Sequence, residues 1–289
     1  MEIMDYKSAL KEKIYHSLRK LPRKRVAVSF SGGVDSSVIA KMCKDIGKDV
    51  ELYTVSFDSE SDIKTAKKAA NELGLPIIYL SVGLDELECT LKKVLSMISY
   101  RKLAGLNTSI GFYHVMEMVA KNNVDLLISA NGSDELFCGY NRYKELYPDN
   151  DEIKKYMLEI LRIANHDMNQ VRIIGKKFGV EYKVPLLDDD VVSFSMDIPL
   201  KLKIKSRKDE LRKHILRDIA RDIGLSEEIS MKPKKAFQYS SGVMKGIRKL
   251  AKRNGFTKNS EMAKGFESEL EAYIEHLKDE LRKQGELIV

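Results

Sequence analysis

The chain has 289 residues, of which 43% are hydrophobic and 32% are charged, and its formal net charge is +7. This length and composition predict a globular protein with its own core, and no segment approaches the roughly 18 consecutive apolar residues of a membrane-spanning helix. The cysteines Cys43, Cys89 and Cys138 form no paired motif. Their spacing excludes a zinc or disulfide framework and favours a reducing, cytoplasmic setting. The mild basic excess suits anionic ligands, although interleaved Lys and Glu are also typical of a solvated surface.

The first half of the chain alternates between strand and helix patterns. Leu10, Ile14 and Leu18 recur at helical spacing, and Gly47 and Gly74 are placed to end later helices. The predicted helices are 5–19, 36–46, 63–73, 84–99 and 110–122, and the predicted strands are 25–30, 50–57, 76–81 and 124–129. This alternation predicts an α/β fold, a parallel sheet flanked by helices. Ligands of such sheets bind at the carboxyl ends of the strands.

After Pro148 the pattern becomes mostly helical. An edge strand is expected at 180–184, and a long, charged amphipathic helix at 262–281. That helix is expected to pack on the domain, with binding of a partner protein as the alternative. The sequence therefore predicts an α/β core over residues 1–148 that continues into a helical part over residues 149–289.

A glycine-containing loop, Ser31-Gly32-Gly33-Val34-Asp35-Ser36-Ser37, follows the first strand and begins a helix. Its glycines allow left-handed backbone angles, so that N–H groups and the positive end of the helix can receive a phosphate. The serines offer hydroxyl donors. Asp35 would repel a bare phosphate, which indicates a Mg²⁺ ion between them. The kinase-type phosphate loop is absent, and the segment resembles the loop of the N-type ATP pyrophosphatases, which split ATP into AMP and pyrophosphate.

A second loop, Ser129-Ala130-Asn131-Gly132-Ser133-Asp134-Glu135, follows the fourth strand and also begins a helix. Its small residues allow a nucleotide to approach closely, and Asp134 supplies a second carboxylate. Together with Asp35 it would complete a magnesium–pyrophosphate site. Taken alone, acidic residues at a helix start are explained equally well by the helix dipole.

Together the two loops resemble the synthetase domain of the asparagine synthetase family, whose second loop reads Ser-Gly-Glu-Gly-Ser-Asp-Glu. Further segments match family patterns in the same order, namely Lys-Val-Pro-Leu-Leu-Asp at 183–188, Lys-Asp-Glu-Leu-Arg at 208–212 and Lys-Pro-Lys-Lys-Ala-Phe at 232–237. The resemblance covers residues 5–243. It implies an adenine nucleotide alpha hydrolase-like fold that activates a carboxylate, such as that of L-aspartate, as acyl-AMP. An amide would then form from ammonia or another amine.

The resemblance also implies a set of site residues. Asp35, Asp134 and Lys234 would be catalytic; Asp35 and Asp134 would hold Mg²⁺, and Lys234 would stabilise charge on the phosphates at the transition state. Without the resemblance, Lys234 would be read as a surface residue in a cluster of lysines. The residues expected to bind ATP are Ser29, Ser31, Gly32, Gly33, Asp35, Ser36, Ser37, Val55, Ser129, Ala130 and Gly132.

The sequence departs from the family pattern at several positions. Glu2 stands where the family's glutaminase domain has its nucleophilic cysteine, so we expect free ammonia, another amine, or a separate glutaminase subunit to supply nitrogen. Asn131 replaces a Glu assigned to the incoming amine, and an amide cannot act as a general base. Ala130 and Cys138 replace glycines, and Lys183 replaces an Arg. These departures leave the ATP chemistry as expected but make asparagine itself an open hypothesis.

Two other functions remain as alternatives. An RNA-modifying adenylase would use the same loop, which the basic charge favours, but the chain lacks paired cysteines and an RNA-binding domain. A nucleotide-binding protein without catalysis is suggested by Asn131.

Overall fold

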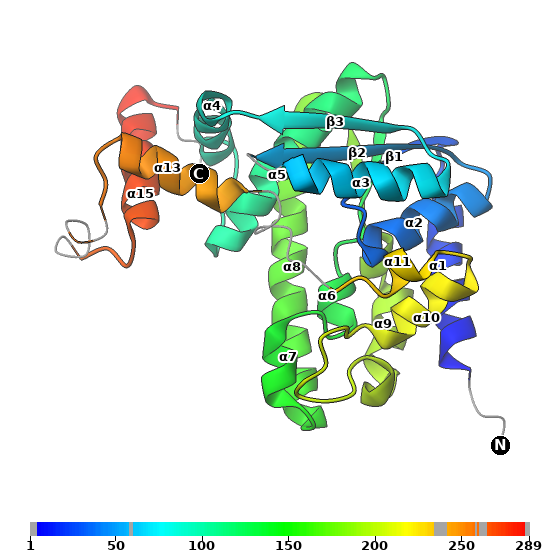
Figure 1. The fold of residues 1–289 in the computed structure, drawn as a ribbon. Helices are drawn as coiled ribbons and strands as arrows, with labels where there is room; N and C mark the ends of the chain where they lie inside the picture. Colours follow the sequence, from blue (N-terminus) through cyan, green and yellow to red (C-terminus); the bar gives the residue numbers. More distant parts are fainter. Residues whose placement is uncertain (1–4, 58–59, 234–241, 258, 260–264, 287–289) are drawn as a thin grey trace.

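The computed structural model describes residues 5–57, 60–233, 242–257, 259 and 265–286 (Figure 1). Its centre is a five-stranded, wholly parallel sheet in the order β3-β2-β1-β4-β5. The strands are β1 (Arg25–Ser29), β2 (Asp49–Phe57), β3 (Ile77–Val82), β4 (Leu126–Ile128) and β5 (Glu181–Lys183). The predicted α/β class and parallel sheet are confirmed, and the expected edge strand is β5.

Helices cover both faces of the sheet. The helices of the first half are α1 (Tyr6–Arg19), α2 (Val34–Asp45), α3 (Glu60–Leu73), α4 (Leu84–Leu95) and α5 (Leu103–Lys121). Helices α2 and α3 pack on one face of β1, β2 and β3, and α5 packs on the other face of β2. Side chains along the strands alternate accordingly. Val26 and Val28 of β1 belong to the core on the α2 side, whereas Ala27 between them belongs to the core on the α5 side.

The second half is mostly helical and returns once to the sheet, through β5. Its elements are α6 (Ser133–Leu136), α7 (Asn141–Leu146), α8 (Asn150–Phe178), η1 (Pro185–Leu187), α9 (Asp189–Asp197), η2 (Leu200–Leu202), α10 (His214–Asp222), α11 (Glu227–Ser230), α13 (Val243–Arg253) and α15 (Glu269–Gln284). Helix α8 has 29 residues. Its first half packs into the core on the α2 side and its second half into the core on the α5 side.

Helix α5 begins seven residues before its predicted start at 110. Gly105 and Asn107 weaken the helical pattern there because both have low helix propensity. Gly105 is needed for close packing, since a Cβ at this position would lie 2.6 Å from Oδ1 of Asp167 on α8. The long charged helix at the C-terminal end also differs: α15 begins at Glu269, where the hydroxyl of Ser268 accepts from the N–H of Glu271.

The order of the strands determines where a ligand can enter. From β1 the chain adds β2 and β3 on one side, and then crosses to the other side of β1 to add β4 and β5. The carboxyl ends of β1 and β4 therefore border the point at which the direction of winding reverses. Crevices form at such points because the two following loops turn away from each other.

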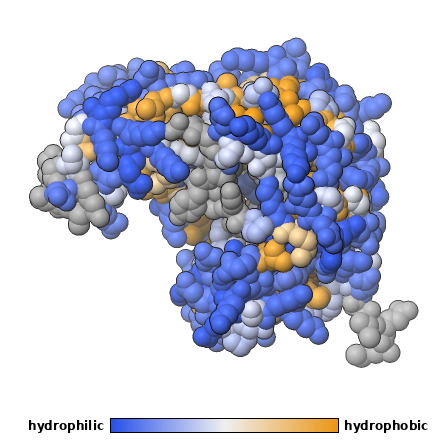
Figure 2. All heavy atoms as spheres, in the orientation of Figure 1, coloured by the Kyte–Doolittle hydropathy of each residue, from blue (hydrophilic) through white to orange (hydrophobic). Residues whose placement is uncertain are grey.

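The helices α4, α13 and α15 pack together beyond the ends of β2 and β3. Figure 2 shows the molecule hollowed between this group and the part that carries α7. Hydrophilic residues cover most of the face drawn there. None of the helices in the described ranges is both long and apolar enough to span a membrane.

One lysine of the second half is buried and forms no ion pair with any carboxylate of the described residues. Lys203 is 2% exposed, and its ammonium donates to the carbonyl of Ser195 at 2.5 Å. Burial lowers the pKa of Lys203 to about 8. The folded protein therefore binds this proton more weakly than the unfolded chain does. The resulting cost to stability is fully present below pH 8 and is relieved as pH rises toward the ordinary lysine value.

We predict that Lys203→Met stabilises the protein by about 1–2 kcal/mol at pH 7, because it removes a buried charge at the cost of one hydrogen bond. Urea unfolding at pH 7 and pH 10 measures this. The gain should shrink at pH 10, where the wild-type lysine has lost its proton. Lys201→Met, two residues away at an exposed position, is the control and should change little. Destabilisation by Lys203→Met at pH 7 would contradict the argument.

Candidate active site

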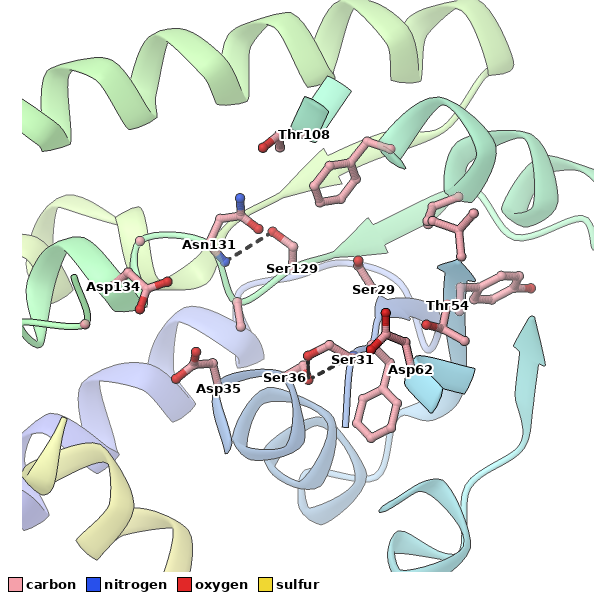
Figure 3. A pocket seen from close by; sticks show the side chains of 18 of the residues that line it. Ser29, Ser31, Asp35, Ser36, Thr54, Asp62, Thr108, Ser129, Asn131 and Asp134 are labelled. Atoms are coloured by element: carbon pink, nitrogen blue, oxygen red, sulfur yellow. Dashed lines mark hydrogen bonds between the residues drawn. The ribbon is translucent and has the colours of Figure 1, made fainter. Parts of the chain in front are cut away.

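A cavity of about 830 Å³ opens at the carboxyl ends of β1, β2 and β4. Its walls come from the loop after β1, the end of β2, the loop after β4, and the turn before α10. In Figure 3, Ser31 and Ser36 line one wall and Ser129 and Asn131 the facing one, with Thr54 at one end and Asp134 at the other. A cavity of this volume accommodates a nucleotide together with a small second substrate.

The loop after β1 is shaped by its own hydrogen bonds. The Oγ of Ser36 accepts from the backbone N–H of Ser31 at 3.2 Å, and the Oγ of Ser31 accepts from the N–H of Gly33 at 3.3 Å. Gly32 has φ +68°, and a Cβ there would lie 2.8 Å from the carbonyl oxygen of Thr65. Both the left-handed backbone and the close packing of α3 therefore require glycine at this position.

The loop after β4 is hydrogen-bonded to the first loop. Its Ser133 hydroxyl donates to Oδ1 of Asp35 at 2.8 Å. Gly132, with φ +91°, precedes α6 and lets the chain turn into that helix. The hydroxyl of Ser129 lies 2.6 Å from that of Tyr182 on β5 and accepts from the N–H of Asn131 at 3.4 Å. Strand β5 thus helps to fix the second loop.

The ammonium of Lys213 lies between the two predicted magnesium ligands. Its Nζ is 2.6 Å from Oδ2 of Asp35 and 2.6 Å from Oδ1 of Asp134, and its side chain is completely buried. Burial alone would lower the pKa of Lys213, but the carboxylates of Asp134 and Asp35 outweigh this effect and raise it. Lys213 therefore remains charged and holds the two carboxylates at one place in the site.

Sequence analysis missed Lys213, although the sequence holds a signal for it. The pattern Lys-x-x-Leu-Arg occurs at 208–212, where we matched it to the family, and again at 213–217 as Lys-His-Ile-Leu-Arg. Lys208 is exposed, whereas Lys213 and Arg217 are both buried. The second copy is the one whose lysine enters the site.

The residues present are suited to a magnesium ion that is shared with phosphate. Asp35 and Asp134 with Lys213 keep a net negative charge, and Mg²⁺ prefers one or two carboxylates together with phosphate and water oxygens. Among the described residues, no group of three or more His, Cys, Asp or Glu side chains could hold a metal ion by itself. The two aspartates therefore fit Mg²⁺ that arrives with a nucleotide.

Glu135, which is buried, and Tyr140, which is partly buried, form a polar pair in the cavity wall. The hydroxyl of Tyr140 donates to Oε1 of Glu135 at 2.7 Å. Burial, and then the nearby charge of Asp134, raise the pKa of Glu135 above its ordinary value. This part of the wall can therefore present either a carboxyl proton or a hydrogen-bond acceptor to a substrate.

The predicted site residues differ in how they reach the cavity. Those that line it are Ser29, Ser31, Asp35, Ser36, Val55, Ser129, Ala130, Gly132 and Asp134. Gly32 and Gly33 belong to the loop backbone. The hydroxyl of Ser37 is buried without a hydrogen-bond partner in the described part of the chain, and this residue does not line the cavity. Lys234 lies outside the described residues. Arg212, Tyr140 and Asn141 also line the cavity and were not predicted.

Gly139 has no side chain, and this leaves space for the contact between Asp134 and Lys213. A Cβ at this position would overlap Oδ1 of Asp134 and lie 2.5 Å from Cε of Lys213. We predict that Gly139→Ala destabilises the protein by about 1–3 kcal/mol, because an overpacked site must move the ion pair. Gly83→Ala is the matched control, since a Cβ there meets nothing within 4 Å.

Urea unfolding of the single and double variants checks this prediction. Most of the cost of Gly139→Ala should disappear in an Asp134→Ala background, which removes the overlapping oxygen. An equal cost in both backgrounds would mean that the overlap with Asp134 is not what destabilises Gly139→Ala.

The chain is similar to a protein family and to several known proteins. A family model described as asparagine synthase matches residues 9–173 and 157–285. The chain is 32% identical over 282 residues to a Methanocaldococcus jannaschii protein named "Putative asparagine synthetase (glutamine-hydrolysing) 1", covering 86% of this chain and 51% of that protein. It is 25% identical over 228 residues to the glutamine-hydrolysing asparagine synthetase of Gallus gallus, covering 76% of this chain and 40% of that enzyme.

A solved NH3-dependent NAD synthetase from Campylobacter jejuni aligns with a TM-score of 0.41 and 14% identity, covering 99% of this chain and 96% of that chain. The chain spans about half the length, or less, of the curated relatives named above. The family model matches most of the chain, and the M. jannaschii relative exceeds 30% identity over most of it. These matches confirm the resemblance inferred from the two loops: the chain belongs to the asparagine synthase family.

Proposed function

We propose that the chain is an ATP-dependent, AMP-forming amide ligase that activates a carboxylate and transfers it to ammonia or another amine. The observation that carries this proposal is the junction of the two loops at the reversal point of the sheet. There Ser133 donates to Asp35, and Lys213 contacts both Asp35 and Asp134. Such a junction places hydroxyl and N–H donors beside two carboxylates, which is a suitable environment for the phosphates of MgATP.

In the first step a carboxylate oxygen of the acceptor attacks the α-phosphorus of ATP. A bond forms between this oxygen and phosphorus, the bond to the β-phosphate bridging oxygen breaks, and pyrophosphate leaves. The loop after β1 would bind the pyrophosphate through its N–H groups and the hydroxyls of Ser31 and Ser36. Val55 at the end of β2 would contact the adenine. Fixed donors of this kind stabilise the charge that develops as pyrophosphate departs.

Magnesium, held by Asp35 and Asp134 through the nucleotide, would neutralise charge on the leaving pyrophosphate. Lys213 would keep the two carboxylates together whether or not a nucleotide is bound. Lys234 retains its predicted role at the phosphates.

In the second step the amine nitrogen attacks the acyl carbon, AMP leaves, and the nitrogen loses a proton. Asn131 lines the cavity where the family has Glu, and its amide cannot accept that proton. We propose L-aspartate as the first acceptor to examine, with free ammonia or a separate glutaminase as the nitrogen source. Asn131→Glu should increase ammonia-dependent amide formation if the acceptor pocket has kept the family's geometry.

The first test is chromatographic detection of AMP formed from MgATP, with and without L-aspartate and ammonium. AMP and asparagine formed together would support both steps. AMP without asparagine, or AMP only with other carboxylates, would keep adenylation and change the acceptor. Tight ATP binding with no AMP from any acceptor would support the alternative of a non-catalytic nucleotide-binding protein.

We predict that Asp35→Asn lowers the rate of AMP formation by at least about 100-fold, because it removes a charged ligand from the phosphate site. The protein should stay folded, since Lys213 keeps Asp134 as its partner. Asp45→Asn, at the other end of α2, is the matched control and should leave the rate unchanged. Undiminished AMP formation by Asp35→Asn, with melting curves that match the wild type, would refute the role of Asp35.

A further inference from the structure

Arg217 on α10 is the largest of the fully buried side chains in the described ranges, with 1% of it exposed. It forms no ion pair with any carboxylate that the structure describes. A buried guanidinium is costly unless its N–H donors are satisfied. The groups that accept from it therefore indicate what it does.

The guanidinium joins two segments of the chain that are distant in sequence. On one side it donates to the carbonyls of Leu211 and Arg212, with the shortest contact at 2.7 Å. On the other side it donates to the carbonyls of Ser230 and Lys232, at 2.5 and 3.0 Å. Both segments border the cavity, because Arg212 and Pro233 line it. The planar fork of an arginine is suited to hold two such segments together.

The first of these segments is a turn with an unusual backbone. Arg212 and Lys213 have φ of +49° and +53°, a conformation that is rare for residues other than glycine. Asp209 holds the same turn, because its Oδ1 accepts from the N–H groups of Leu211 and Arg212 at 3.1 and 3.0 Å. Burial alone would raise the pKa of Asp209, but hydrogen bonds to its carboxylate outweigh burial and lower the pKa to about 2. Strained backbone of this kind persists only where its surroundings hold it.

This turn determines where the ammonium of Lys213 lies. The ammonium is 2.6 Å from one oxygen of Asp35 and 2.6 Å from one oxygen of Asp134. Figure 3 shows both aspartates at the end of the cavity away from Thr54. A divalent cation bound by the same two oxygens would need this space, because Mg²⁺ lies about 2.1 Å from its ligands.

The ammonium also offsets one of the two negative charges. A free divalent cation therefore meets a site that is occupied and has lost half of its charge. Mg²⁺ on a nucleotide differs, because phosphate oxygens already supply part of its coordination and it needs fewer ligands from the protein.

We propose that Arg217 is a positioning residue that keeps the Lys213 ammonium between Asp35 and Asp134, and that the ammonium prevents these carboxylates from binding a divalent cation unless a nucleotide brings it. Metal and nucleotide would then enter the site as one complex. The inference rests on the proposed function only in placing Mg²⁺ at the two aspartates. It requires no ligase reaction.

The test is binding of Mn²⁺, a paramagnetic substitute for Mg²⁺, to the full chain without nucleotide or acceptor. Electron paramagnetic resonance measures the free Mn²⁺. Lys213→Met should raise the affinity for Mn²⁺ by at least about tenfold, because it removes a positive charge from beside the two carboxylates. Arg217→Lys should raise it by about three- to tenfold, because it keeps the charge at 217 but loses the planar fork that holds the turn.

Arg221→Lys is the matched control. Arg221 lies one turn further along α10, is exposed, and pairs with Asp218 of the same helix. This variant should leave the affinity for Mn²⁺ unchanged. Asp209→Asn weakens the turn from its other side and should also raise the affinity, so that it serves as a second route if Arg217→Lys does not fold.

Double variants show whether Arg217 acts through Lys213. In a Lys213→Met background, Arg217→Lys should add less than about twofold, because the group that it positions is gone. In an Arg217→Lys background, Asp134→Ala should abolish the gain, which assigns the new metal binding to the aspartates. A general loosening of the fold would produce neither pattern.

Several outcomes would overturn the inference. No gain in Lys213→Met would refute the exclusion of free metal, as would wild-type protein that binds Mn²⁺ equally well with and without α,β-methylene-ATP. A gain in Lys213→Met but in neither Arg217→Lys nor Asp209→Asn would refute the positioning role, as would equal effects of Arg217→Lys in the two backgrounds.

The two proposals fail separately, because Mn²⁺ binding is measured without any reaction. AMP formation by the wild type with no gain of Mn²⁺ affinity in any variant would keep the ligase and refute this inference. The expected gains without AMP formation from any acceptor would do the reverse.

Discussion

The contact of one buried ammonium with two carboxylates is the constraint on which the rest of the site depends. Asp35 and Asp134 belong to the two loops that meet where the strand order of the sheet reverses. Without Lys213 between them, these two partly buried carboxylates would repel each other. Lys213 in turn could not stay charged at zero exposure without them. Each group therefore makes the position of the others possible. The turn that carries Lys213, the hydrogen bond from Ser133 and the absence of a side chain at Gly139 all serve this contact.

The sheet and the two loops could be predicted from the sequence because their signals are local. A short apolar strand followed by glycine, serine and aspartate indicates a phosphate loop without knowledge of the remaining chain, and two such loops of a parallel sheet must share an edge. Lys213 could not be found in this way. It lies 80 positions after Ser133 in the sequence, and two consecutive segments, which begin at Lys208 and at Lys213, satisfy the same pattern. Only burial, which depends on packing, distinguishes them.

The positions of Ser37 and Arg212 show the same limit. Consecutive residues at the start of α2 point in different directions, so that Ser36 lines the cavity while Ser37 turns into the core; a run of serines does not reveal this. Arg212 is one of many arginines in a charged chain, and it is buried at a turn with positive φ whose N–H group donates to Oδ1 of Asp209. Lys234, which the family resemblance singles out, lies outside the described residues and remains a prediction.

Helix α8 has a consequence for how the molecule holds together. The first half of α8 belongs to the core on the α2 side and packs against α6, which follows the loop after β4, and its second half belongs to the core on the opposite face of the sheet. A loss of packing in either core would therefore disturb the same helix. Strand β5, which follows α8, pairs with β4 next to the loop after β4. Helix α8 therefore connects the cores on the two faces of the sheet. The two loops of the site are held in place by a much larger part of the chain than the loops themselves.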